Sequence, residues 1–275
     1  MFIIQILLNY QEINGCWIDM ARKPFAFKQF TVEQEQVTLA VTTDACLFGA
    51  SIDLGPAASI LDLGTGTGLL LLMLAQRYPQ LLGYGLELDP ATALQAAANA
   101  ASSPFHKRLH IAQGDWNQPI WKTVQTTPSS FDDSGKPRET LDFSSWPKRF
   151  DALVCNPPFF EGQQESQDPL KRSARHQASG SLEKLLYRAS TLLNPSGQLY
   201  LLLPPESCPL DWGPWHIASL QPIAAHPEKS PHLLSLTLQL NPASGLKKKV
   251  LFTYDQPGTY SLEAKQLLRE FYLNL

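Results

Sequence analysis

The chain has 275 residues, which is enough for one large domain with a sizeable hydrophobic core. Its formal net charge of -3 is close to balanced. This excludes a strongly basic nucleic-acid-binding protein, so any such partner must contact local basic patches. The cysteines show no C-x-x-C spacing and indicate reduced thiols in a cytosolic protein rather than a disulfide framework or a zinc site; they are Cys16, Cys46, Cys155 and Cys208.

The chain begins with an apolar stretch, residues 2–8, that is too short to span a membrane. No positive residue precedes it, so a signal peptide is not expected. Met20 opens a more ordinary start, "MARKPF", which leads to the hypothesis that residues 1–19 are an upstream-start extension. We therefore expect an N-terminal extension over residues 1–24 and a single domain over residues 25–275.

From Ser59 onward, strand-like apolar runs alternate with helix-like runs, an order that indicates an α/β sheet with a parallel centre. Two late runs, Leu233–Leu240 and Lys248–Tyr254, are interpreted as a terminal antiparallel pair. Residues 116–148 are rich in Ser, Thr, Pro and Asp without periodicity, which predicts a long surface insertion. The expected strands are Ser59–Gly64, Leu81–Leu88, Arg108–Asp115, Phe150–Cys155 and Gly197–Pro204, and the expected helices are Leu69–Tyr78, Pro90–Ser102 and Ser181–Leu193.

A glycine-rich stretch, "DLGTGTG" at Asp62–Gly68, joins the first expected strand to the first helix. Glycines at 64, 66 and 68 let the backbone turn sharply and approach a ligand closely, next to the N–H groups of a helix. The spacing differs from the dinucleotide fingerprint G-x-G-x-x-G, and no Gly-Lys-Ser/Thr follows, so ATP is disfavoured.

Two acidic residues end the following strands. Glu87 stands 19 residues after Gly68, where a carboxylate can accept both hydroxyls of a ribose. The alternative is a solvated surface acid, but the glycine-rich stretch favours ribose binding. Asp115 can accept from the exocyclic amine of an adenine, with Trp116 nearby for stacking; the alternative is a turn cap.

The stretch "NPPF" follows the fourth expected strand, at the sheet edge where α/β proteins bind ligands. Pro157 and Pro158 end the strand ladder, because proline has no backbone N–H. A backbone held rigid by these prolines lets the Asn156 side-chain oxygen and the Pro157 carbonyl both accept from a planar NH2 group, such as that of adenine. For an isolated "NPPF", a strand terminator with a buried Phe159 would be the better interpretation.

The two acceptors have a chemical use, because the lone pair of an aryl amine is delocalised into the ring and is a poor nucleophile. Acceptors that favour the pyramidal, charge-gaining amine stabilise the transition state more than the ground state. Phe159 would stack on the base and hold the nitrogen in line with a methyl donor. No strong general base is required, because the amine becomes acidic once it has attacked.

Together these motifs resemble the class I S-adenosylmethionine-dependent methyltransferases that act on amino or amide nitrogens. The flanking stretches are similar to the bacterial tRNA1(Val) (adenine-37-N6)-methyltransferase family, from about Phe25 to Leu275. The resemblance implies a Rossmann-like, mostly parallel seven-stranded sheet with a C-terminal antiparallel pair and helices on both faces. It also implies methyl transfer to N6 of adenine-37, beside the anticodon of tRNA(Val). The flanking stretches are Phe25–Val32, Val41–Ala50, Leu72–Arg77, Ser103–Leu109 and Tyr260–Leu275.

The resemblance also implies a role for each residue of the motifs. It places Thr43 and Asp44 in the cofactor pocket, although Ala45 stands where the family usually has glycine. Phe159 stands where tyrosine is commoner in adenine enzymes, so stacking is kept without a hydroxyl contact. The implied cofactor residues are Asp62, Gly64, Gly66 and Gly68 for the methionine end, Glu87 for the ribose and Asp115 for the adenine; the implied target-base residues are Asn156, Pro157 and Phe159.

Basic residues near the site fit phosphate contacts with the anticodon arm. Any single basic residue is equally compatible with a solvated surface. His176 has no second histidine at metal-ligand spacing, so no metal is expected. No membrane partner is expected either, because the apolar stretch at residues 2–8 is too short to span a membrane. The predicted RNA-binding residues are Lys28, Lys171, Arg172, Arg175 and His176, with Arg22, Lys23 and Lys247–Lys249 as further candidates.

Three other functions remain open at this point. Protein glutamine-N5 methyltransferases of the release-factor type also use Asn-Pro-Pro with an aromatic residue, but residues 1–58 leave little room for their separate helical domain. Ribosomal RNA guanine-N2 methyltransferases with "NPPF" tend to be longer, often with duplicated domains. A non-catalytic RNA-binding module is disfavoured because every expected pocket residue is present.

Overall fold

The computed structural model of the chain describes seven ranges, and all structural statements below refer to them: residues 10–13, 16–19, 23–35, 40–118, 146–157, 182–242 and 245–275.

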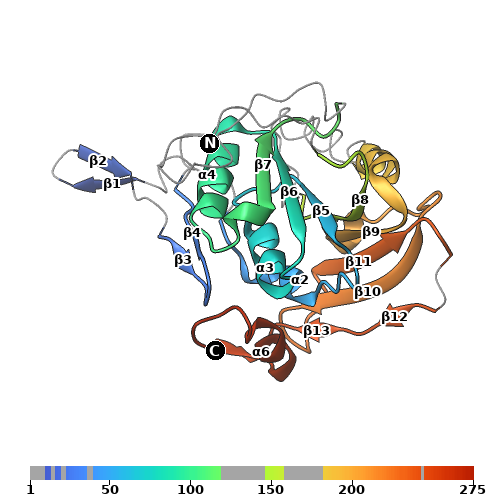
Figure 1. Ribbon diagram of the computed structural model, residues 1–275. Coiled ribbons are helices and arrows are strands. Elements are labelled where there is room, and N and C mark those ends of the chain that lie inside the picture. The colour runs from blue at the N-terminus through green and yellow to red at the C-terminus, as the bar shows by residue number, and fades with distance from the viewer. Residues whose placement is uncertain are drawn as a thin grey trace, which may run out of the picture.

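A central sheet with the strand order β12-β10-β11-β9-β8-β5-β6-β7 organises the molecule (Figure 1). In its parallel part, β9-β8-β5-β6-β7, the chain first adds β6 and β7 on one side of β5 and then β8 and β9 on the other side. The strand order therefore switches between β8 and β5. Such a switch point is where open α/β sheets bind ligands, at the carboxyl ends of the strands. The parallel strands are β5 (Ser59–Leu63), β6 (Leu82–Glu87), β7 (Leu109–Gln113), β8 (Phe150–Cys155) and β9 (Leu193–Leu203).

The predicted mostly parallel α/β sheet is confirmed, with an antiparallel pair near its C-terminal end. The members of that pair are β10 (His216–Ala224) and β11 (Leu233–Gln239). The expected pairing of Leu233–Leu240 with Lys248–Tyr254 is wrong, because β12 (Lys247–Lys248) and β13 (Leu251–Phe252) run parallel to β10. These two short edge strands bring the described sheet to nine strands.

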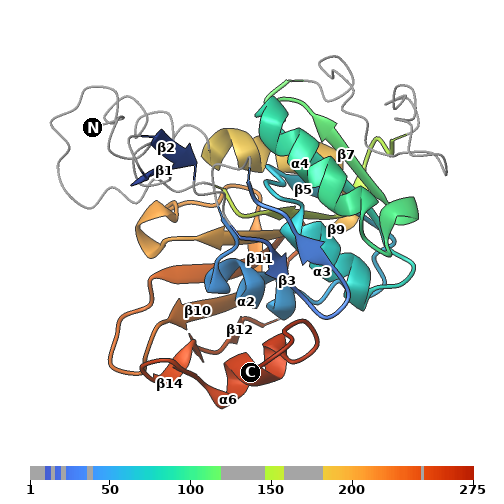
Figure 2. The same cartoon turned by 90° about the vertical axis from the view of Figure 1, so that its left-hand side faces the viewer.

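Helices cover both faces of the sheet, as expected. Alternate strand residues supply the two hydrophobic clusters; Ile60 packs on one face and Leu61 on the other. The helix at residues 182–192 covers the second face, and α6 packs against α2 on the first (Figure 2). The helices of the first face are α2 (Thr43–Ser51), α3 (Leu69–Arg77), α4 (Pro90–Ala101) and α6 (Leu262–Leu268).

The segment at residues 25–32 packs against the C-terminal segment. Lys28 N donates to Phe271 O at 2.8 Å, and its ammonium donates to Arg269 O at 2.6 Å. The division into an extension and a domain from residue 25 stays a prediction. The remaining elements are β1 (Tyr10–Ile13) paired with β2 (Cys16–Asp19), β3 (Phe25–Ala26) with β4 (Thr31–Val32), β14 (Tyr254–Gln256) with β15 (Thr259–Tyr260), and the short helices η1 (His106–Arg108) and η4 (Pro205–Ser207).

Most of the predicted insertion at 116–148 lies outside the described residues, as does the Ser181 cap. Within the described ranges, no helix combines the length and the apolar character needed to cross a membrane.

Arg108 is expected to be a principal stabilising residue of this fold. Its guanidinium donates to Ala75 O at 2.8 Å, Leu81 O at 2.9 Å and Tyr78 O at 3.1 Å, so it satisfies carbonyls at the C-terminal end of α3 and directly before β6. Arg108→Ala should therefore lower the free energy of unfolding by about 2 kcal/mol in urea denaturation. The exposed neighbour Lys107→Ala is the control and should change it by less than about 0.5 kcal/mol; equal effects would contradict the assignment.

Candidate functional site

The glycine loop, residues 64–68, connects β5 to α3 at the switch point. Gly64, Gly66 and Gly68 have φ values of 78°, 56° and 81°, a backbone conformation that other residues rarely adopt. A Cβ added at Gly64 or Gly66 would meet nothing within 4 Å. These two glycines therefore serve the shape of the loop, and the space above them is open to a ligand.

Glu87 holds the glycine loop in place from the end of β6. Its Oε2 accepts from Gly66 N and its Oε1 from Asp89 N, both at 3.0 Å. A carboxylate has about four lone-pair sites, so two ribose hydroxyls can still be accepted. The structure thus brings Glu87 to the glycine loop, and ribose binding by Glu87 stays a prediction.

Asp62 lies buried beneath the loop. Thr65 Oγ1 donates to its Oδ2 at 2.8 Å, while its Oδ1 has no hydrogen-bond partner among the described residues. Burial raises the pKa of Asp62 to about 7; the Thr65 hydrogen bond opposes this rise and the nearby charge of Glu87 adds to it. A buried, unsatisfied carboxyl oxygen can accept from a cationic group of a ligand.

Asp115 adopts the turn-cap geometry that was the alternative to adenine binding. Its Oδ1 accepts from Asn117 N at 2.8 Å and from Asn117 Nδ2 at 3.1 Å. Trp116 packs against the hydrophobic cluster of the second face. An adenine contact by Asp115 stays a prediction, and such a contact would be made through its other oxygen, Oδ2.

Thr43 and Asp44 form the first turn of α2, after the cap residue Thr42. Asp44 Oδ2 lies 3.1 Å from Nε2 of His232, which directly precedes β11. Their place in a cofactor pocket stays a prediction.

Asn156 follows β8 at the same sheet edge as the glycine loop. β8 pairs with β5 in parallel, with Asp62 opposite Val154. The thiol of Cys155 donates to Leu63 O at 3.0 Å, so the residues directly before Asn156 and the loop are in contact. Burial keeps the pKa of Cys155 well above its ordinary value, and the thiol stays neutral. Asn156 and Pro157 are both half-buried and remain accessible.

Of the other predicted site residues, one lies within the described ranges and five lie outside them. Lys28 is described and contacts the C-terminal segment, so a role in RNA binding stays a prediction. Among the described residues, no group of three or more His, Cys, Asp or Glu side chains could hold a metal ion. Phe159, Lys171, Arg172, Arg175 and His176 lie outside the described residues.

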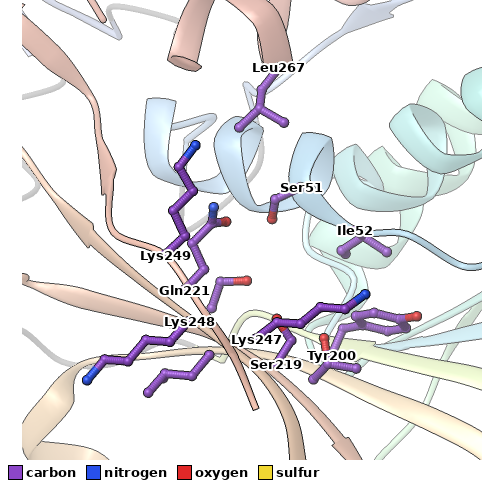
Figure 3. Close-up of a pocket in the computed structure, with 12 residues that line it drawn as sticks. Ser51, Ile52, Tyr200, Ser219, Gln221, Lys247, Lys248, Lys249 and Leu267 are labelled. Atoms are coloured by element: carbon purple, nitrogen blue, oxygen red, sulfur yellow. The ribbon is translucent and has the colours of Figure 1, made fainter. Parts of the chain in front are cut away.

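The lysine run lines a separate cavity of about 430 Å³, between the end of α2, the strands β9 to β12 and α6 (Figure 3). Lys247 extends toward Tyr200 and Ile52, whereas Lys248 points the opposite way. Lys249 pairs with Glu263. Tyr200 donates to the carbonyl of Asp53, which precedes β5, so this cavity lies toward the amino ends of the strands and away from the glycine loop.

Asn99 of α4 was not singled out by the sequence. Its side chain is 2% exposed, and it donates to Thr67 O in the glycine loop and to Glu33 O, both at 2.9 Å. It also accepts from Glu33 N at 3.0 Å. The available signal was an asparagine within an alanine-rich helix, where a polar side chain on the buried face must find partners.

Asp62 is expected to make stability depend on pH. Its raised pKa means that the folded protein retains a proton which the unfolded chain releases near pH 4, so the free energy of unfolding falls as the pH rises toward about 7. Asp62→Asn keeps an acceptor for Thr65 and removes the charge. The free energy of unfolding of Asp62→Asn, measured relative to that of wild type, should therefore rise by roughly 3 kcal/mol between pH 4 and pH 8. Urea titrations without ligand measure this, and parallel pH profiles would contradict it.

Comparison with known proteins places the chain in a family. No family model matches it. The tRNA1(Val) (adenine(37)-N6)-methyltransferase of Porphyromonas gingivalis is 43% identical over 184 residues, which are 66% of this chain and 64% of that protein. The chain therefore spans slightly less than two thirds of that relative. The proteins of the same name from Vibrio vulnificus and Bacteroides thetaiotaomicron are 32% and 33% identical, over 92% and 93% of this chain and 97% and 100% of their own lengths.

A solved structure supports the fold. A predicted O-methyltransferase from Agrobacterium tumefaciens superposes with a TM-score of 0.53 and 16% identity, over 84% of this chain and 99% of its own. Since the full-length relatives exceed 30% identity along nearly the whole chain, the protein belongs to the family of tRNA1(Val) (adenine(37)-N6)-methyltransferases.

Proposed function

We propose that the protein transfers the methyl group of S-adenosylmethionine to N6 of adenine-37 in tRNA1(Val). The observation that supports this most directly is the contact between Leu63 and Cys155, which sets the glycine loop and Asn156 side by side at the switch point. The full-length relatives carry the name of this activity, and the glutamine and guanine alternatives are not favoured.

The residues of the glycine loop fit this cofactor. S-adenosylmethionine, when bound, supplies a methyl group on a positively charged sulfur. The open space above Gly64 and Gly66 can accommodate its methionine end, and the unpartnered Asp62 Oδ1 can accept from its ammonium group. Glu87 would hold the ribose, and Asp115 would hold the adenine through Oδ2.

Asn156 and Pro157 would hold the target amine. The side-chain oxygen of Asn156 and the carbonyl oxygen of Pro157 would each accept a hydrogen bond from the amine, and so favour it as it becomes pyramidal and gains charge. Phe159 would stack on the adenine and keep its nitrogen in line with the methyl group.

The tRNA would be held mainly through its phosphates. Lys171, Arg172, Arg175 and His176 follow the target-base residues closely in the chain, and such side chains position RNA without reading its sequence. Lys28 is a further contact on the described surface. A tRNA substrate places the protein in the cytoplasm.

The activity is tested with radiolabelled S-adenosylmethionine and tRNA from a strain that lacks this gene. After nuclease digestion, we expect the label in N6-methyladenosine. A tRNA1(Val) transcript with guanine at position 37 is the matched control and should stay unlabelled. Label only in added release factor, label in guanine, or no label with any substrate would overturn the proposal.

Asn156→Ala tests the role of the side-chain acceptor. It should bind S-adenosylmethionine as wild type does but lose turnover by about 100-fold, because the acceptor is needed chiefly in the transition state. The exposed Asn241→Ala is the control and should retain full turnover. An equal loss of cofactor affinity would show that Asn156 belongs to the cofactor pocket instead.

A further inference from the structure

Both side-chain donors of Asn99, and its oxygen as an acceptor, are engaged by two distant segments. Its two N–H groups donate to Thr67 O and Glu33 O, and its oxygen accepts from Glu33 N. With the side chain 2% exposed, no donor is left to contact a ligand directly. Any effect of Asn99 on the site must therefore act through the backbone of the residues it holds.

Asn99 restrains one peptide unit of the glycine loop, the one between Thr67 and Gly68. The Thr67–Gly68 peptide donates through Gly68 N to Thr65 O at 2.9 Å, and its carbonyl accepts from Asn99. Gly66 and Gly68, on either side of Thr67, have positive φ, and glycine gives the chain most freedom to rotate there. A Cβ added at Gly68 would lie 3.6 Å from the carbonyl oxygen of Ala96, one turn before Asn99 on α4, so this helix passes close to the loop.

On its other side, Asn99 connects to the segment that leads into α2. Glu33 is followed by Gln34, whose side chain donates to Lys23 O at 2.7 Å and accepts from Val41 N at 2.9 Å. Val41 precedes Thr42, the cap of α2, and then Thr43 and Asp44. A continuous series of hydrogen bonds and adjacent residues thus joins the glycine loop to the start of α2.

We propose that Asn99 is a positioning residue that couples the glycine loop to the segment before α2, so that cofactor affinity depends on a side chain outside the pocket. This inference rests on the proposed function only in taking the glycine loop as the cofactor site. Asn99 sets the loop in its binding conformation before the ligand arrives, and its loss leaves that ordering to be achieved on binding.

The test is calorimetric titration of S-adenosylhomocysteine, the stable reaction product, into the folded protein without RNA. Asn99→Ala should bind about tenfold more weakly, a change expected when hydrogen bonds to a loop are lost. Gln34→Ala should also bind more weakly, because it releases the other end of the series. In tRNA assays, both variants should raise KM for S-adenosylmethionine and leave kcat at saturation within about twofold of wild type.

The matched control is Asn194→Ala, which removes a comparable bond to Asp151 (2.8 Å) at the amino end of β8. It should lower stability without changing affinity. In the double variant Asn99→Ala/Gln34→Ala, the fold-loss of affinity for S-adenosylhomocysteine should be smaller than the product of the two single fold-losses. In Asn99→Ala/Asn194→Ala, it should equal that product.

The proposal would be overturned if Asn99→Ala bound S-adenosylhomocysteine as tightly as wild type, or if its loss of affinity matched that of Asn194→Ala. If Asn99→Ala does not fold, Gln34→Ala decides in the same way, since the coupling requires it to weaken binding. Titration without RNA keeps the outcome independent of the tRNA substrate: a wild type that binds the product but does not methylate tRNA would contradict the proposed function alone.

Discussion

The parallel pairing of β5 with β8 is the constraint on which the site depends. Because side chains and backbone groups at the same level of adjacent strands are close, the pairing of Asp62 with Val154 sets the last residues of the two strands, Leu63 and Cys155, next to each other. One strand continues into the glycine loop and the other into Asn156, and the bond from Cys155 to Leu63 O fixes their relative height. The glycine loop and Asn156 thereby become neighbours, although they follow separate strands.

Electrostatics determines which ligand such a loop can take. A helix N-terminus preceded by glycines is usually an anion site, because its free N–H groups attract phosphate. Here the carboxylate of Glu87 accepts from Gly66 N, and the acidic side chain of Asp62 lies beneath the same turn. The carboxylate of Glu87, and Asp62 when it is ionised, oppose a phosphate and favour a ligand that combines hydroxyl donors with positive charge. This agrees with the absence of a Gly-Lys-Ser/Thr stretch and gives a structural reason why ATP is disfavoured.

The sequence predicted the centre of the fold better than its edge. The strands β5 to β8 are apolar on both faces and end at glycine, acidic residues or proline, so their bounds are visible in the sequence. β10 was missed because Ser219 and Gln221 interrupt its apolar run and Pro222 lies inside it. The pairing of the late strands was then assigned wrongly, since sequence proximity does not determine which strand lies beside which. Asn99 was missed for a related reason, because its partners are 32 and 66 residues away along the chain.

The position of α4 shows why those distant partners matter. The start of this helix is tied to Glu87, which accepts from Asp89 N and from the glycine loop at once. Its middle lies close to Gly68, where an added Cβ would lie 3.6 Å from Ala96 O, and it holds Thr67 through Asn99. α4 is therefore linked to the loop at its start and through Asn99, so a shift of this helix would displace both Glu87 and the Thr67–Gly68 peptide. The preference for alanine on its buried face follows from this role, because small side chains let the helix backbone approach the loop closely.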